Sequence, residues 1–322
     1  MKAENQYKSL CNENPWPMRF QLRDGELLQA IQKYDGVLAR RQIKQLFWKD
    51  ANPKTMERRL TLLLRNAYLN MPSAEQRRIY PIPEPIVFLG WRGMLYLTRR
   101  MEIEVDDPPT VNENQLRRLE VKLRSLGVHW QREPRWSQLG HDILLNDFRM
   151  TIEQAVSFWP SLEIEDWIPE GQFLSNMDVI RLRQRSKGIR PDGFFVLVDH
   201  LRLINNSPAK ARFLLEFDNG THPLSRFGRD KAVPGMAYIR SQAYKERFGF
   251  NSGRWLIVCR SEQRMLHLKS QTEKLLGKNA SYFLFTFMEK VNAKSVLNKP
   301  IWLCGGSSEH VQLIKNIGAV NG

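Results

Sequence analysis

The stretch RPDGFFVLVDHLRLINNSPAKARFLLEFDNGT, residues 190–221, decides the fold of the larger part of this chain. Two apolar runs within it, 194–198 and 213–217, have the length of buried strands. The polar residues between them, 202–212, are typical of a connecting loop. The stretch therefore predicts two neighbouring strands joined as a hairpin.

Three carboxylates flank these two strands. Asp192 opens the first strand, and Glu216 and Asp218 close the second. Residues i and i+2 of a strand face the same side, so Glu216 and Asp218 are expected to project together, and hairpin pairing would bring Asp192 to them. Converging carboxylates suit a hard cation such as Mg²⁺, which could activate water for attack on a phosphodiester.

A purely structural alternative exists for two of these acids. Pro191-Asp192-Gly193 and Asp218-Asn219-Gly220 are turn-forming tripeptides without any metal. Glu216 does not fit that alternative, because it interrupts an apolar strand.

Helices and strands alternate on both sides of the hairpin. The periodicity predicts helices at 141–156, 225–248 (interrupted near Pro234-Gly235) and 262–276, and strands at 162–168, 255–258, 281–287 and 301–304. This order predicts an α/β domain built around a mixed sheet.

The N-terminal third has a different pattern, with helices expected at 24–34 and 39–47 followed by the turn WKDANP. Asn52 is a good N-cap and Pro53 suits the first helical position, so a third helix should run to about Tyr68. Its apolar side chains cluster on one side, and the opposite side carries Lys54, Arg58, Thr61 and Arg65.

This spacing is typical of a helix-turn-helix, whose third helix enters the major groove of DNA. The alternative is an ordinary solvated charged face. Strands at 68–70 and 78–80 around a polar tip predict a β-hairpin wing, and the wing would place Arg77 and Arg78 on backbone phosphates.

These patterns divide the chain into a winged helix-turn-helix at 1–104, a linker at 105–111 and an α/β domain at 112–322. The linker, VDDPPTV, is acidic and contains proline. The helix expected at 112–126 is suited either to bridging the domains or to supporting a homodimer. The fold class is thus α/β (α+β overall).

Charge points to a polyanion as the partner. The formal net charge is +15, and residues 1–100 hold 18 Lys and Arg against 9 Asp and Glu. Such an excess favours nucleic acid, because counterions released from phosphates drive binding. Double-stranded DNA is therefore the expected partner. No apolar stretch approaches the length of a membrane helix, and three widely spaced cysteines indicate neither zinc nor disulfides, so a cytoplasmic location is expected.

Residues RPDGFFVL and FLLEFDNGT resemble the PD-(D/E)XK restriction-endonuclease-like superfamily. The order of LGHDILLNDFRMTIEQA, Trp167-x-x-Glu170, RPDG and LEFDNGT resembles the replication-relaxation family of plasmids and other mobile genetic elements, which pairs a winged helix with a nuclease-like core. The resemblance covers roughly residues 24–260.

The resemblance implies a set of site residues. Asp192 and Glu216 would hold the metal, and Glu170 would be an additional acid. The lysine usual two residues after the second acid is Asp218 here, which leaves catalytic activity an open question. Lys231 could replace that lysine, and Arg229 is the other local candidate.

Three functions follow as hypotheses. The first is a double-stranded-DNA-binding protein of replication-relaxation type. The second is a Mg²⁺-dependent DNA endonuclease targeted by the winged helix, with Asp192, Glu216, Asp218, Lys231 and Glu170 in the catalytic site. The third is a transcriptional regulator whose second domain senses a ligand or dimerises.

Overall fold

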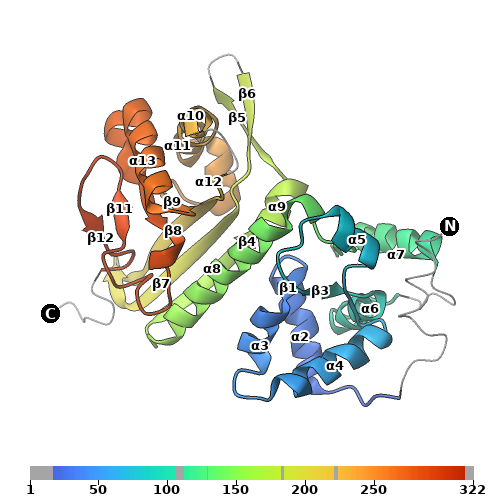
Figure 1. Ribbon diagram of the computed structural model, residues 1–322. Coiled ribbons are helices and arrows are strands. Elements are labelled where there is room, and N and C mark those ends of the chain that lie inside the picture. The colour runs from blue at the N-terminus through green and yellow to red at the C-terminus, as the bar shows by residue number, and fades with distance from the viewer. Residues whose placement is uncertain (1–16, 106–111, 129, 183–184, 221–223, 316–322) are drawn as a thin grey trace. The chain divides into compact units, whose positions relative to one another are not determined.

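The computed structural model describes residues 17–105, 112–128, 130–182, 185–220 and 224–315 (Figure 1). Contacts within the chain group the residues into two compact units, Met1–Asn146 and Asp147–Gly322. The boundary between the units falls inside one helix, α8 (Leu139–Ser157). Each unit is described by itself.

The first unit combines helices with a three-stranded antiparallel sheet in the order β1-β3-β2. Its elements are α2 (Leu22–Lys33), β1 (Val37–Ala39), α3 (Arg40–Phe47), α4 (Pro53–Arg65), β2 (Leu69–Asn70), α5 (Ala74–Ile79), β3 (Ile86–Leu89), α6 (Trp91–Arg100) and α7 (Glu113–Ser125). The three helices expected between residues 24 and 68 are confirmed as α2, α3 and α4, although α4 ends at Arg65.

The start of α4 follows from its local sequence. The Asn52 side chain accepts a hydrogen bond from the Lys54 backbone N–H at 2.9 Å, and Pro53 occupies the first turn. Met56, Leu60 and Leu63 are buried, so the opposite face of α4 points toward solvent. Burial of this apolar stripe holds the helix in place.

Two glycines allow α6 to pack closely on the turn that follows α4. A Cβ on Gly90 would lie 2.2 Å from the Ala67 carbonyl oxygen, and one on Gly93 would lie 2.2 Å from the Tyr68 carbonyl oxygen. No side chain fits at those distances, so glycine is required at both positions.

The predicted wing strand at 78–80 is wrong, because residues 74–79 form helix α5. The cause is a capping box: the Ser73 hydroxyl accepts from the Gln76 N–H at 3.1 Å, and the Gln76 side chain accepts from the Ser73 N–H at 2.8 Å. The strand β2 instead pairs with β3, which begins at Ile86. The connection between these strands is therefore long and partly helical.

The first unit extends beyond residues 105–111, where the sequence predicted a linker. The Gln42 side chain donates to the Ile143 carbonyl at 2.9 Å, and the Asn146 side chain donates to the Val37 carbonyl at 2.8 Å. Leu139 and Ile143 share an apolar cluster with residues of β1 and β3. The chain up to Asn146 thus groups with the first unit, and the proposed linker, except Val105, lies outside the described residues.

The second unit is built on a mixed seven-stranded sheet, in the order β12-β11-β10-β9-β8-β7-β4. Its strands are β4 (Leu162–Pro169), β7 (Gly193–Ile204), β8 (Ser207–Asp218), β9 (Arg254–Cys259), β10 (Phe283–Phe287), β11 (Trp302–Cys304) and β12 (His310–Val311). Strand β8 pairs antiparallel with β7 and parallel with β9. The expected α/β class with a mixed sheet is confirmed.

Helices cover one face of this sheet: α10 (Leu224–Phe227), α11 (Val233–Ile239), α12 (Gln242–Phe248) and α13 (Glu262–Leu276) (Figure 1). That face buries Phe194, Leu214 and Ile257 against Met236 and Leu268. On the other face, Phe195 stacks on Trp167 with ring centroids 4.8 Å apart. Core residues on both faces keep the central strands out of water.

The predicted loop at 202–212 is wrong in extent, because β7 and β8 continue through it. The hairpin turns at Asn205 and Asn206, whose φ angles of 51° and 61° are left-handed and suit a tight two-residue turn. Side chains in this part of the ribbon are largely exposed, so no buried apolar run marks the strands there.

The sequence did not predict a short hairpin beside the sheet. Helix α9 (Glu170–Ser175) leads into β5 (Asp178–Leu182) and β6 (Arg185–Ile189), which pair with each other. This segment returns the chain to Asp192. Among the described residues, no helix is long and apolar enough to cross a membrane.

Candidate functional site

The exposed side of α4 is the first candidate surface. Lys54, Arg58 and Thr61 are exposed, whereas Arg65 is half-buried. The other charges near the middle of the helix are paired: Glu57 with Arg40 at 2.7 Å, and Arg59 with Asp24. No ion pair joins Lys54 or Arg58 to a carboxylate within the described part of the chain.

The first turn of α4 favours an anion. It contains no acidic residue, and Lys54 adds a positive charge where the helix dipole is already positive. Backbone N–H groups at such an end are common phosphate contacts. Arg77 and Arg78 are also exposed, on the last turn of α5 instead of a wing strand.

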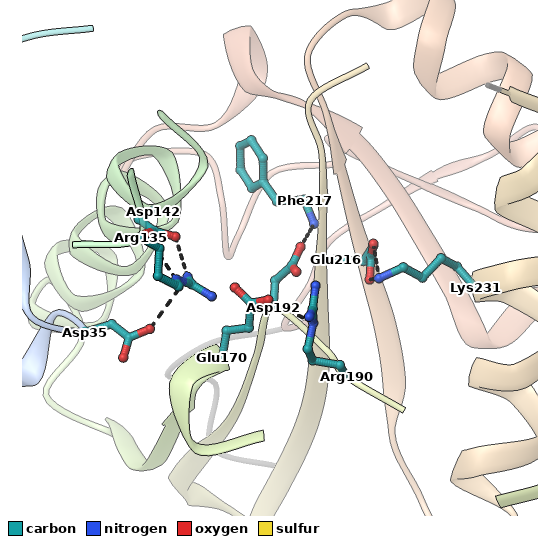
Figure 2. A network of polar contacts seen from close by, with 9 residues as sticks. All are labelled: Asp35, Arg135, Asp142, Glu170, Arg190, Asp192, Glu216, Phe217 and Lys231. Atoms are coloured by element: carbon teal, nitrogen blue, oxygen red, sulfur yellow. Dashed lines mark hydrogen bonds and ion pairs between the residues drawn. The ribbon is translucent and has the colours of Figure 1, made fainter. Parts of the chain in front are cut away.

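The carboxylates of the second unit lie around the paired ends of β7 and β8. Gly193 pairs with Leu215, so Asp192 and Glu216 stand opposite each other in register. The Asp192 carboxylate accepts a hydrogen bond from the Phe217 N–H at 2.6 Å, and the Asp192 N–H donates to the Leu215 carbonyl at 2.9 Å. These bonds fix Asp192 against β8 (Figure 2).

Glu170, at the start of α9, lies beside Asp192. One carboxylate oxygen of each residue lies within 4.8 Å of the other. The Glu170 side chain is almost fully buried and forms an ion pair with Arg190 Nε at 3.1 Å. Figure 2 shows the Arg190 and Asp192 side chains close to Glu170.

Glu216 and Asp218 are each engaged by a cation. Lys231 Nζ lies 2.7 Å and 2.8 Å from the two oxygens of Glu216, as Figure 2 shows. Arg264, in the first turn of α13, donates to both oxygens of Asp218 at 2.6 Å and 2.9 Å. The three acids expected to converge, Asp192, Glu216 and Asp218, do not form one close group of oxygens among the described residues.

Lys231 reaches Glu216 from an unusual helical turn. Residues Gly228–Ala232 form a π-helical turn, in which the Val233 N–H bonds to the Gly228 carbonyl. Burial lowers the pKa of Lys231, but the charges of Glu216 and Asp192 outweigh it and hold that pKa above its ordinary value. Lys231 is therefore a stable cation.

The residues present fit a hard cation in part. Glu170 and Asp192 offer neighbouring carboxylate oxygens, the ligand type that Mg²⁺ prefers. As placed here, Glu216 would have to exchange Lys231 for the metal, and Asp218 would have to exchange Arg264. Asp218 thus already has a cation partner in Arg264.

Sequence reasoning missed Arg190 and Arg264 as partners of Glu170 and Asp218. A signal was available, because a buried carboxylate needs a compensating cation. Arg264 comes three residues after Ser261, which caps α13, directly beyond β9. Since β9 runs parallel to β8, its end lies beside Asp218.

A comparison of the chain with protein-family models, curated proteins and solved structures finds no match.

Proposed function

We propose that this chain is a double-stranded-DNA-binding protein whose first unit is a winged helix-turn-helix that inserts α4 into the major groove. The order α2-β1-α3-α4-β2-α5-β3 and the sheet order β1-β3-β2 support the proposal. The observation that carries it is the exposed pair Lys54 and Arg58, which no carboxylate of the described residues neutralises, on a helix whose Glu57 and Arg59 are already paired.

The second unit would then be the nuclease-like partner domain, as in the replication-relaxation proteins of plasmids and other mobile elements that the sequence resembles. Binding to the phosphate backbone would supply affinity, and base-edge contacts from Arg58 and Thr61 would supply specificity.

Duplex binding of the full chain tests this proposal. We expect Lys54→Ala with Arg58→Ala to weaken binding of a fluorescein-labelled duplex. The plot of the logarithm of the binding constant against the logarithm of the salt concentration should become less steep, by up to about 2. Arg117→Ala with Arg118→Ala, which also removes two positive charges, from exposed positions of α7, is the control. Unchanged affinity of the α4 variant beside a wild type that binds would remove α4 from the interface.

The proximity of Glu170 and Asp192 favours a second candidate function, a divalent-metal-dependent DNA endonuclease. Glu170 and Asp192 would hold the metal together with Glu216, and Lys231 would supply positive charge near the phosphate. A bound Mg²⁺ would polarise the phosphodiester and lower the pKa of an attacking water.

Supercoiled plasmid incubated with Mg²⁺ or Mn²⁺ tests the endonuclease. We expect nicking by the wild type to be lost in Asp192→Asn and retained in Asp166→Asn, which removes an exposed carboxylate of β4. Nicking that survives Asp192→Asn, or its complete absence with either metal, would rule against this candidate and leave the second unit as a DNA-holding module.

A further inference from the structure

The hairpin β5–β6 carries a concentrated positive charge that neither proposed site uses. Arg181 and Arg185 are exposed, and Lys187 is half-buried. The strands pair Leu182 with Arg185 and Ile180 with Lys187, so these cations occupy a ribbon only two strands wide. In Figure 1 the hairpin projects beyond the helices that cover the seven-stranded sheet.

The base of the hairpin is fixed to the second unit. Ile180 and Ile189 are buried in its core cluster. Asp178 accepts hydrogen bonds from Arg247 at 2.5 Å and 2.8 Å, and from the Tyr238 hydroxyl. Burial and the neighbouring Asp178 carboxylate raise the pKa of Tyr238, so the hydroxyl keeps its proton and donates. The ribbon therefore presents its charges from a rigid support.

The hairpin's own acid cannot neutralise those charges, because Asp178 is paired with Arg247. Within the described ranges, no ion pair joins Arg181, Arg185 or Lys187 to a carboxylate. Arg185 and Lys187 lie two residues apart on β6 and face the same side of the ribbon, where their like charges repel each other, whereas Arg181, opposite Ser186, faces the other side. A bound polyanion would relieve that repulsion.

We propose that hairpin β5–β6 is a second duplex-DNA contact, in which Arg181, Arg185 and Lys187 bind backbone phosphates independently of α4. The choice of duplex DNA as the polyanion rests on the proposed function. The major groove admits a two-stranded ribbon, and arginine matches phosphate geometry with two parallel hydrogen bonds. The chain then holds DNA at two separate points, one in each unit.

Salt titrations of the full chain on a labelled 40-base-pair duplex test this contact. We expect Arg181→Gln with Arg185→Gln to make the plot of log binding constant against log salt concentration less steep by nearly 2, because each lost phosphate contact removes about 0.9 from the steepness. Lys274→Gln with Lys278→Gln removes two exposed cations elsewhere in the second unit and should leave the slope unchanged. Wild-type affinity and slope in the hairpin variant would overturn the proposal.

Crossing this variant with Lys54→Ala and Arg58→Ala separates the two ideas. Loss of binding only in the α4 variant overturns the hairpin contact and leaves the proposed function standing. Loss of binding only in the hairpin variant overturns the α4 contact and leaves the hairpin contact standing. A wild type that binds no duplex overturns both. Additive losses support both contacts.

Anionic lipid is the competing polyanion, because Met177 and Val179 at the hairpin base are exposed and apolar. Vesicles containing phosphatidylserine distinguish the two. Vesicle binding that depends on Arg181 and Arg185, with DNA binding unaffected, would also overturn the proposal. Thermal unfolding of each variant should match the wild type, since the substituted side chains are exposed.

Discussion

Arg59 reaches from α4 to the carboxylate of Asp24 in α2, which is fully buried. The same carboxylate accepts from the Gln21 N–H at 2.7 Å, so it ties together the start of α2 and the middle of α4. Arg58, the next residue along the helix, is exposed. Neighbouring arginines of one helix thus have opposite surroundings.

These surroundings predict that substitution of Arg59 affects stability, whereas substitution of Arg58 affects DNA binding. Arg59→Ala should lower the free energy of unfolding by about 3–5 kcal/mol, because it leaves a buried carboxylate uncompensated. Arg58→Ala should change it by no more than about 0.5 kcal/mol while weakening DNA binding. Urea denaturation of both variants measures the difference, and equal stabilities would contradict it.

Asp142 gives a second prediction at the scale of single residues. Burial raises its pKa to about 6, although Arg135, which donates to both of its oxygens, acts in the opposite direction. The unfolded chain has an aspartate pKa near 3.9. Between these values the folded state binds the proton more tightly, so stability falls as pH rises from about 4 to 6.

Stability measured at pH 4.5 and 6.5 checks this. The wild type should lose about 2 kcal/mol more than Asp142→Asn over that interval. Asp166→Asn removes an exposed carboxylate and serves as the control. Parallel pH profiles of the wild type and Asp142→Asn would show that Asp142 does not titrate in this range.

At the scale of elements, the packing of α6 on the turn after α4 depends on Gly93. Gly93→Ala should destabilise the chain by at least about 1–3 kcal/mol, because the added methyl meets the Tyr68 carbonyl oxygen. Gly140→Ala, in the first turn of α8, meets nothing within 4 Å and should stabilise by up to about 1 kcal/mol. Thermal unfolding of this matched pair measures both effects.

Helix starts and apolar strands were predictable because their signals are local. The Asn52-Pro53 pair marked the start of α4, and the apolar runs at 194–198 and 213–217 lie within β7 and β8. Helix α5 could have been predicted from Ser73 and Gln76, since its capping box is also local. The outer part of the β7–β8 ribbon was missed, because its exposed residues form no apolar run of strand length.

At the scale of the whole molecule, the net charge of +15 acts on stability as well as on partners. Self-repulsion of a strongly charged chain opposes folding, and salt screens it over about 10 Å at 0.1 M and about 3 Å at 1 M. We therefore expect the melting temperature to rise between these NaCl concentrations. A falling melting temperature would mean that screening of ion pairs such as Arg264–Asp218 dominates instead.

The sequence by itself determined the helices α2, α3 and α4, the apolar cores of β7 and β8, the mixed α/β class and the positions of the carboxylates, because periodicity, caps and turn residues act within a few neighbours. Only the tertiary structure decided which cation meets which carboxylate: Lys231 with Glu216, Arg264 with Asp218 and Arg190 with Glu170. The physical reason is that such pairs depend on strand order and helical phase. The parallel placement of β9 beside β8 and the π-helical turn at Gly228–Ala232 involve contacts between distant segments, which no local pattern specifies.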